Sequence, residues 1–137
     1  MKLIQTIKIL AACGLLISVY LLWQQMYRPA FQPCTINATV NCDAIISGPV
    51  AKTLGIPTPL YGFIGYLVIL YAAFFDKRTL LLATTVFGVG FCLWIAFIEI
   101  VQLRVLCPVC VACQVIMLAI LVLALRLRQG IQLENTK

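Results

Sequence analysis

The sequence contains no histidine, only two serines (Ser18 and Ser47) and only four acidic residues among its 137. Histidine is the commonest general base near neutral pH and the commonest metal ligand, so its absence removes both roles. Charged residues make up 10% of the chain, well below the roughly 25% of a soluble domain. No run of basic residues is present, which argues against nucleic-acid binding. The chemistry that remains is mostly that of the seven cysteines.

Hydrophobic residues make up 64% of the chain and gather into four long apolar blocks. About 20 consecutive apolar residues span the hydrocarbon core of a bilayer. We therefore expect an all-α integral membrane protein, a four-helix bundle that forms a single domain over residues 1–137. The expected helices cover residues 9–26, 58–75, 80–101 and 109–126, and a cysteine-bearing extracytoplasmic loop covers residues 27–56. Close helix packing is expected at Gly62, Gly65, Gly88 and Gly90.

The first apolar block has two other interpretations. A cleaved signal peptide needs a short apolar core followed by a small-residue cleavage site, but this block is long and no such site follows it. Leu10-Ala11-Ala12-Cys13 is similar to a bacterial lipobox, yet the apolar run continues past the cysteine, where a lipoprotein would turn polar. We therefore interpret the block as a membrane helix and Cys13 as a small buried hydrophobic residue.

Three expectations concern the polar segments between and after the apolar blocks. Residues 44–54 are expected to form a short interfacial helix, residues 102–106 a short loop, and the residues after Arg128 a short polar tail. Glu99 lies near the end of the third block. We favour an interfacial carboxylate close to Arg104 over a proton-handling role.

The distribution of lysine and arginine predicts the orientation in the membrane. Four spans place both termini on one side, together with the turn at residues 76–78. That side holds seven basic residues, and the other side holds three, so we expect the termini to be cytoplasmic. The seven are Lys2, Lys8, Lys77, Arg78, Arg126, Arg128 and Lys137; the three are Arg28, Lys52 and Arg104. The loop at residues 27–56 then faces the exterior, where disulfides persist.

The motif Cys107-Pro108-Val109-Cys110 stands where a loop becomes the last helix. Proline suits a first helical turn, and cysteines at i and i+3 can close a disulfide across that turn. A helix N-terminus also favours the thiolate form. Cys34 and Cys42 lie on the same expected face, so four cysteines share an oxidising surface. The three cysteines expected within helices are Cys13, Cys92 and Cys113.

Two cysteine pairs on one face favour a relay. Thiol–disulfide exchange moves an oxidising equivalent between pairs through a mixed disulfide. The relay would run from a soluble dithiol to the loop pair, to the helix pair, and on to a lipid-soluble quinone. Two alternatives remain open: a non-enzymatic membrane subunit with structural disulfides, or a metal-binding protein. For the second, Cys107, Cys110 and Cys113 form C-x2-C-x2-C, which is similar to part of an iron–sulfur or zinc ligand set.

The cysteine pairs belong to a longer series of motifs. In order, these are Cys34…Cys42-Asp43, Ser47, Gly55-Ile56-Pro57, Tyr61-Gly62-Phe63-Ile64-Gly65-Tyr66 and Cys107-Pro108-Val109-Cys110. Together they resemble the vitamin K epoxide reductase (VKOR) family, most closely its bacterial-type homologues that oxidise thioredoxin-fold partners, over residues 8–127. DsbB is also a four-helix quinone enzyme with two cysteine pairs, but there the CxxC pair comes first. The reverse order in this chain favours the VKOR type.

The resemblance implies a role for each cysteine of the two pairs. Cys34 would exchange with the partner, Cys42 would pass the disulfide to Cys107, and Cys110 would face the quinone as a thiolate. The residues implied for the quinone pocket are Thr58, Tyr61 and Gln114. The implied cofactor is ubiquinone or menaquinone. The implied partner is a separate DsbA-like protein of the thioredoxin fold, because the chain ends before the fused domain that many bacterial homologues carry.

The chain departs from the family at two points: Gly48 aligns with the usual loop serine, next to Ser47, and Cys113 is unusual.

The function that we expect is a quinone-dependent thiol oxidase in the inner membrane of a prokaryote, with its active-site face periplasmic or extracellular. The enzymatic alternative is reduction of a quinone or a vitamin K epoxide by the same thiols. Without histidine, protons would come from water, from thiols or from a hydroxyl such as that of Tyr61.

Overall fold

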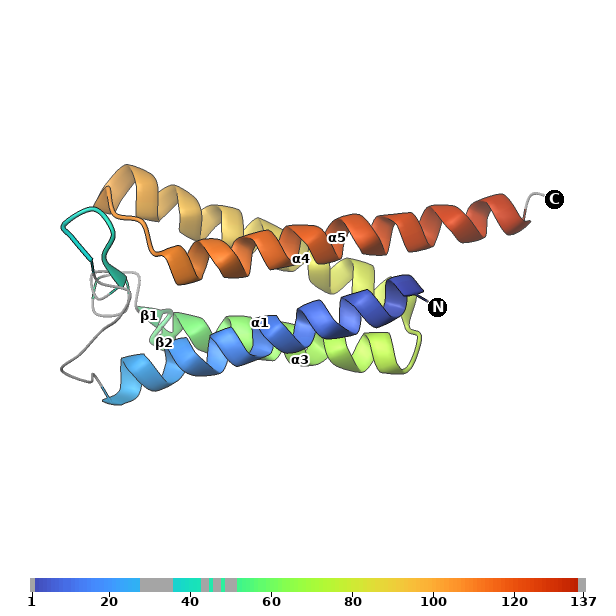
Figure 1. The fold of residues 1–137 in the computed structure, drawn as a ribbon, viewed down its shortest axis with the longest axis horizontal. Helices are drawn as coiled ribbons and strands as arrows, with labels where there is room; N and C mark the ends of the chain where they lie inside the picture. Colours follow the sequence, from blue (N-terminus) through green and yellow to red (C-terminus); the bar gives the residue numbers. More distant parts are fainter. Residues whose placement is uncertain (1, 28–35, 43–44, 46–47, 49–51, 136–137) are drawn as a thin grey trace.

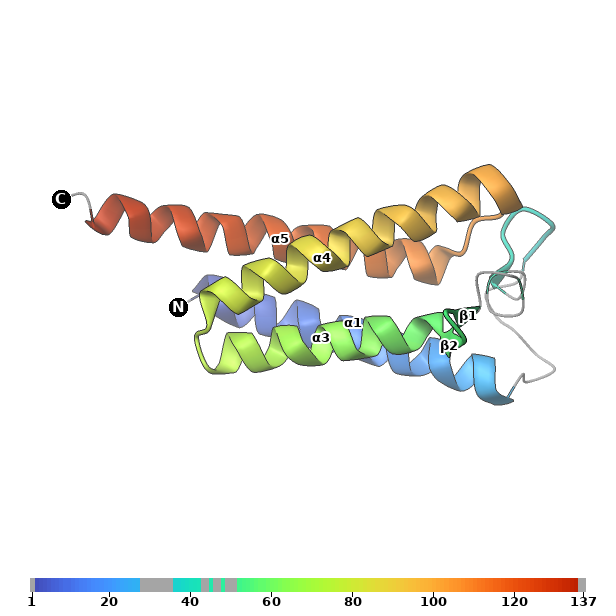
Figure 2. The same ribbon diagram turned by 180° about the vertical axis from the view of Figure 1, so that it is seen from behind.

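The structure is a computed structural model that describes residues 2–27, 36–42, 45, 48 and 52–135. Its described helices form a bundle in which α1 and α4 each pack against both α3 and α5. The bounds are Lys2–Tyr27 for α1, Thr58–Phe74 for α3, Arg78–Phe97 for α4 and Pro108–Asn135 for α5. Both termini lie at one end of the bundle, and residues 36–42 lie at the other (Figures 1 and 2). The predicted all-helical bundle is therefore confirmed, whereas most of the predicted loop lies outside the described residues.

Three of the described helical stretches are long and apolar enough to cross a membrane: Lys2–Tyr27, Arg78–Val101 and Pro108–Gly130. The fourth apolar helix, α3, is shorter, with 17 residues. Large apolar side chains cover the outside of the bundle, such as Leu16, which is 70% exposed. Water would disfavour so much exposed apolar surface, whereas lipid tails accommodate it. These features fit an integral membrane protein.

The helices extend further than the hydropathy of the sequence indicates. The first begins at Lys2 rather than at residue 9, and α5 continues to Asn135 rather than ending near residue 126. Lysine, glutamine, arginine and leucine, which dominate both extensions, are good helix formers, so the backbone bonding continues beyond the apolar run. Hydropathy therefore located the lipid-facing part of each helix and missed its polar ends.

A π-helix, η1 (Ile98–Leu103), continues α4 directly, so the loop predicted for residues 102–106 begins only after it. Arg104 ends η1 in the left-handed conformation (φ 51°), and its N–H donates to the carbonyl oxygen of Glu99. The turn of a π-helix is wider than that of an α-helix, and such turns recur at functional sites. The end of α4 is therefore a distinct local structure and not a frayed terminus.

A short antiparallel hairpin precedes α3. Its strands are β1 (Lys52–Thr53) and β2 (Ile56–Pro57), joined by Leu54 and Gly55 with φ of 56° and 83°. A two-residue turn in which both φ angles are positive matches the right-handed twist of the strands, and glycine makes it accessible. The helix predicted over residues 44–54 is therefore wrong from Lys52 onward. Residues 44, 46–47 and 49–51, in the remainder of that prediction, lie outside the described part of the chain.

Helix packing is close at two of the four predicted glycines. A Cβ added at Gly62 would lie 3.3 Å from the Ser18 hydroxyl of α1, and one at Gly88 would lie 3.0 Å from a methionine of α5. At Gly65 and Gly90 an added Cβ would meet nothing within 4 Å. The prediction of close packing is therefore confirmed at Gly62 and Gly88 and wrong at Gly65 and Gly90.

Cys13 lies on the outer surface of α1, so the prediction of a buried thiol is wrong. The inward face of this helix turn is taken by Ala11 and Gly14, both buried. Cys13 follows Ala11 by two positions, which turns it away from the core because an α-helix has 3.6 residues per turn. In a membrane-spanning helix this small apolar side chain faces lipid.

Candidate redox site

Cys107 lies immediately before α5 and caps its N-terminus. Its carbonyl oxygen accepts a hydrogen bond from the N–H of Val111 (3.0 Å), and its Sγ accepts one from the N–H of Cys110 (3.3 Å). Pro108 begins the helix, at a position where a missing N–H costs nothing. The Cys-Pro-Val-Cys sequence thus folds with its first sulfur at the positive end of the helix dipole.

The surroundings of Cys107 lower the pKa of its thiol below the ordinary value of 9.0. The largest cause is a hydrogen bond with the Cys110 side chain; hydrogen bonds from the backbone N–H groups of Cys110 and Val109 act in the same direction, against the effect of burial. A lower pKa increases the thiolate fraction at neutral pH. The thiolate is the form that attacks a disulfide, so Cys107 is prepared for exchange.

Backbone pairing brings residues 36–42 to the N-terminal end of α5. Leu106 donates its N–H to the carbonyl oxygen of Thr39 (2.7 Å) and accepts a bond from the N–H of Asn41 (3.2 Å). These bonds surround a parallel bridge between Val40 and Leu106. Cys107 follows Leu106 directly and Cys42 follows Asn41, so these bonds bring the two cysteines close together.

Cys42 and Cys107 are in direct contact, with 3.2 Å between their Sγ atoms, and both are fully buried. Cys42 is disulfide-bonded, whereas Cys107 and Cys110 are free thiols. The Cys107 sulfur therefore stands beside one sulfur of a disulfide, which is where an attacking thiolate must stand. Cys34, the other predicted loop cysteine, lies outside the described residues.

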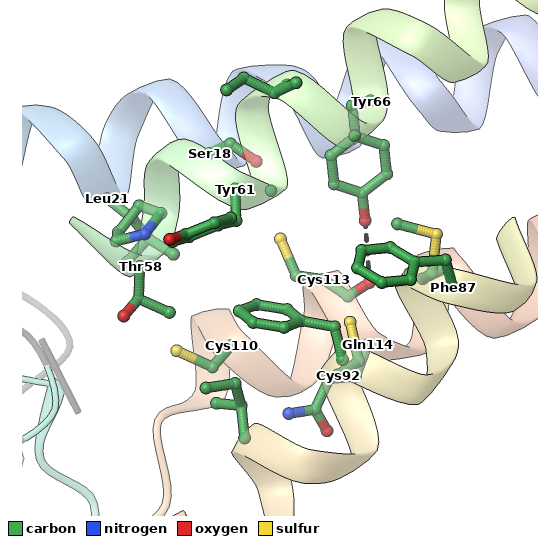
Figure 3. Close-up of a pocket in the computed structure, with 18 of the residues that line it drawn as sticks. Ser18, Leu21, Thr58, Tyr61, Tyr66, Phe87, Cys92, Cys110, Cys113 and Gln114 are labelled. Carbon is green, nitrogen blue, oxygen red and sulfur yellow. Dashed lines mark hydrogen bonds between the residues drawn. The ribbon is translucent and has the colours of Figure 1, made fainter. Parts of the chain in front are cut away.

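A cavity of about 520 Å³ opens between the four helices next to this pair. Its lining is mostly apolar, and Cys110 contributes to it (Figure 3). Thr58 and Tyr61 of α3 and Gln114 of α5, the three residues implied for a quinone pocket, all line the same cavity. The Tyr61 ring packs on a phenylalanine of α4, with 5.5 Å between the ring centroids. The structure thus gathers residues from distant parts of the chain around Cys110.

The cavity fits the chemistry of a quinone headgroup. Ligand cavities of roughly 300–1,000 Å³ with apolar walls and a few polar groups are typical of small-molecule sites. A quinone ring is flat and apolar and carries two carbonyl oxygens, which hydroxyl and amide donors can hold. Thr58, Tyr61 and Gln114 offer such donors, and Cys110 brings a thiol to the same space. These are the residues that would bind and orient a quinone here.

Glu99 lies in this cavity and is only 1% exposed. Its interpretation as an interfacial carboxylate beside Arg104 is therefore wrong. Arg104 is exposed, and among the described residues the only ion pair joins Arg78 and Asp76. A sequence signal was available, because the inward residues of the third block recur at helical spacings of three and four. They are Leu81, Thr85, Gly88, Cys92, Ile95 and Glu99.

Cys92 and Cys113 also line the cavity, as two further thiols within helices. The carbonyl oxygen of Cys113 accepts a hydrogen bond from the Tyr66 hydroxyl (2.9 Å), which ties α3 to α5 (Figure 3). Across the described part of the chain, no group of three or more histidine, cysteine, aspartate or glutamate side chains could hold a metal ion. The C-x2-C-x2-C spacing therefore does not assemble a ligand set from those residues.

We expect the Cys107 thiol to titrate with a midpoint below pH 9.0, because hydrogen bonds stabilise its thiolate. Replacing Cys110 by alanine removes the largest of these bonds, so the midpoint should rise toward the ordinary value. The measurement is the ultraviolet thiolate absorbance of each protein minus that of the same protein carrying Cys107→Ser. Cys13→Ala, which alters an exposed thiol on the outer face of α1, should leave the midpoint unchanged. A wild-type midpoint at or above 9.0 would contradict the expectation.

Comparisons with known proteins identify the family of the chain. A family model described as the vitamin K epoxide reductase family matches residues 5–125. No curated protein sequence gives a significant match. The match covers most of each helix that encloses the cavity, and it includes Cys42 and Cys107. On this evidence the protein belongs to the vitamin K epoxide reductase family, whose members are oxidoreductases with a quinone-linked disulfide redox function.

Proposed function

We propose that the protein is a quinone-dependent thiol oxidase that regenerates the disulfide of a separate, DsbA-like thioredoxin-fold protein. Two electrons would enter at Cys34–Cys42 and leave through Cys107–Cys110. The observation that carries the proposal is the 3.2 Å contact between Cys42 Sγ and Cys107 Sγ, with Cys110 lining the cavity one helical turn further on. The contact supports exchange between the pairs, and the cavity supports a quinone as acceptor.

Transfer between the pairs is a thiol–disulfide exchange through a mixed disulfide. The Cys42 thiolate attacks the sulfur of Cys107, which breaks the Cys107–Cys110 bond and frees Cys110. Cys34 then attacks Cys42, which leaves the loop pair oxidised and the helix pair reduced. A disulfide-bonded Cys42 beside free Cys107 and Cys110 corresponds to the end of this step. The low pKa of the Cys107 thiol favours its departure as a thiolate.

A bound quinone, ubiquinone or menaquinone, supplies an acceptor for two electrons and two protons. Thr58, Tyr61 and Gln114 would hold it with its ring against Cys110. The apolar walls exclude water, so hydrogen bonds from these residues are stronger than they would be in solvent. As the electrons leave the two thiols, the bond between Cys107 and Cys110 forms again.

We assign the thiol end of the bundle to the outer face of the cytoplasmic membrane of a prokaryote. The contact between Cys42 and Cys107 lies at the end opposite both termini (Figure 1). Lysine and arginine are in excess at the end of the bundle that holds both termini and the turn at residues 76–78, which supports a cytoplasmic location for that end. A thioredoxin-fold partner would then meet Cys34 and Cys42 in the oxidising compartment.

The test is quinone reduction in detergent, followed by ultraviolet absorbance, with a reduced thioredoxin-fold protein as donor. Wild type should turn over, and Cys34→Ala should lose turnover with this donor, because the loop pair can no longer be oxidised by exchange. If Cys34→Ala retains turnover with a small dithiol, the loop pair acts only as a shuttle. A wild-type protein that is inert with several quinones and donors would exclude the oxidase function. Reduction of an epoxide in the same assay would favour the reductase alternative.

A further inference from the structure

Glu99 is the one cavity residue with an ionisable carboxyl among those described, and the relay above gives it no role. Its side chain is 1% exposed, and its Oε1 atom has no hydrogen-bond partner. No lysine or arginine lines the described cavity, so no ion pair offsets a negative charge there. Burial of an unpaired carboxylate is unfavourable, which makes the neutral acid the favoured form. An ionisable group kept inside a membrane bundle at this cost points to a function.

The local backbone holds Glu99 firmly in the inward position. It follows Ile95 by four residues on the inward face of α4, so it continues the row that includes Cys92. It lies in the first turn of η1, and its carbonyl oxygen accepts bonds from the N–H groups of Arg104 and Val105 (3.3 Å for the latter). The wide π-turn therefore closes directly on this residue, and these bonds fix its backbone and with it the inward direction of its Cα–Cβ bond.

The carboxyl of Glu99 shares its cavity with the reacting thiol, because Glu99 and Cys110 both line it. The Oε1 atom of Glu99 is buried and makes no hydrogen bond. A buried carboxyl oxygen without a partner, beside a thiol that loses a proton, is placed to exchange a proton within the cavity. The other titratable side chains around the cavity are those of Tyr61, Tyr66, Cys92 and Cys113.

We propose that Glu99 transfers the proton of the Cys110 thiol to an oxygen of the bound acceptor. The proposal rests on the proposed function and names the proton path of its last step. Cys110 gives its S–H proton to the carboxyl of Glu99, and the carboxyl gives its own proton to the acceptor oxygen, so Glu99 ends neutral. The two electrons leave the two sulfurs as the Cys107–Cys110 bond forms. Cys107 starts as a thiolate, so solvent supplies the second proton of the product when it leaves the cavity.

In a chain without histidine, another side chain must carry the thiol proton. A general acid must lie within hydrogen-bonding reach of the proton that it moves. Glu99 lines the same cavity as Cys110 and as the implied quinone ligands, so the proton donor and the proton acceptor of this step share one enclosed space. Tyr61, the hydroxyl considered from the sequence, lines the same cavity and would orient the acceptor rather than carry the thiol proton. The two residues can therefore be separated by experiment.

The test compares Glu99→Gln, which keeps the shape of the side chain but cannot carry a proton, with wild type. The matched control is Thr85→Val, which alters a buried polar residue on the same inward row of α4, outside the cavity. The first readout is the infrared difference spectrum of quinone-free protein, with the Cys107–Cys110 pair oxidised and then reduced. We expect the carbonyl band of a neutral carboxylic acid, shifted by thiol oxidation, in wild type and Thr85→Val and not in Glu99→Gln.

The second readout is single-turnover reduction of an added short-chain quinone by the reduced protein. Glu99→Gln should be slower by about 10²-fold, the usual contribution of a general acid, while exchange between Cys42 and Cys107 keeps its wild-type rate.

Glu99→Asp, which retains an acid, should restore part of the rate and of the infrared band. If Glu99→Gln does not fold, Glu99→Asp is compared with wild type in both readouts instead. A wild-type quinone rate in Glu99→Gln, or a wild-type spectrum without the shifted band, would overturn the proposal. If wild type reduces no quinone but the band still shifts, the oxidase function fails and proton exchange between Glu99 and Cys110 stands.

Discussion

Replacing Cys110 by serine is expected to abolish quinone reduction and to trap a disulfide between Cys42 and Cys107. The Cys107 sulfur stays 3.2 Å from that of Cys42, so it can still attack the loop disulfide and release a loop thiol. Without Cys110 the helix pair has lost the thiol one turn from Cys107 that would attack Cys107 and reopen the mixed disulfide. Turnover should fall by about 10³-fold or more, as for the removal of a nucleophile in other enzymes. Alkylation under non-reducing conditions followed by peptide mass mapping would identify the trapped pair, with Cys34 alkylated.

Cys113→Ala is the matched control for this experiment. Cys113 stands three residues after Cys110, just as Cys110 stands three residues after Cys107, and it lies further along α5 from the contact with Cys42. It should therefore retain turnover and trap no disulfide. If instead Cys113→Ala stops turnover while Cys110→Ser does not, the redox pair on α5 has been assigned one turn too early.

The helices of the bundle could be predicted because hydropathy reports directly on lipid contact. The same property could not locate the helix ends, as the polar extension of α5 to Asn135 shows. The position of Cys107 at a helix N-terminus was also predictable, since Pro108 marks a first turn. The conformation of residues 52–57 was not, because Leu54 takes a positive φ that its side chain ordinarily disfavours. Only the adjacent Gly55 carried a signal for that turn.

The contact between Cys42 and Cys107 could not be derived from the residues alone. It joins positions 65 apart in the sequence and depends on backbone bonds between Leu106 and residues 39–41. Such bonds carry no side-chain signature, so the order of exchange was implied only by the resemblance to the family. Glu99 is a different case. Its helical spacing from Cys92 and Ile95 indicates an inward position. The interpretation of Glu99 as an interfacial carboxylate used only its distance from the end of the apolar block.

Filling the cavity at Gly65 is expected to weaken quinone binding without disturbing the thiols. Gly65 lines the cavity, and a Cβ added there meets nothing within 4 Å, so Gly65→Leu would extend its side chain into the open space. A misplaced group of a few carbons in a ligand pocket costs about 1–3 kcal/mol, which corresponds to roughly 10–200-fold in affinity. We therefore expect the KM for quinone to rise by about 10²-fold. The measurement is steady-state quinone reduction over a range of quinone concentrations.

Gly90→Leu is the control, because Gly90 is equally open to an added side chain but lies on α4 outside the cavity. Both substitutions replace a helical glycine by the same residue, so their effects on helix propensity should be similar. Only the variant at Gly65 should change the KM, and both should exchange between Cys42 and Cys107 at the wild-type rate. An equal KM in the two variants would mean that quinone does not enter this cavity. Cys110 would then have to meet its acceptor from the loop end of the bundle, through the buried cluster around Cys42.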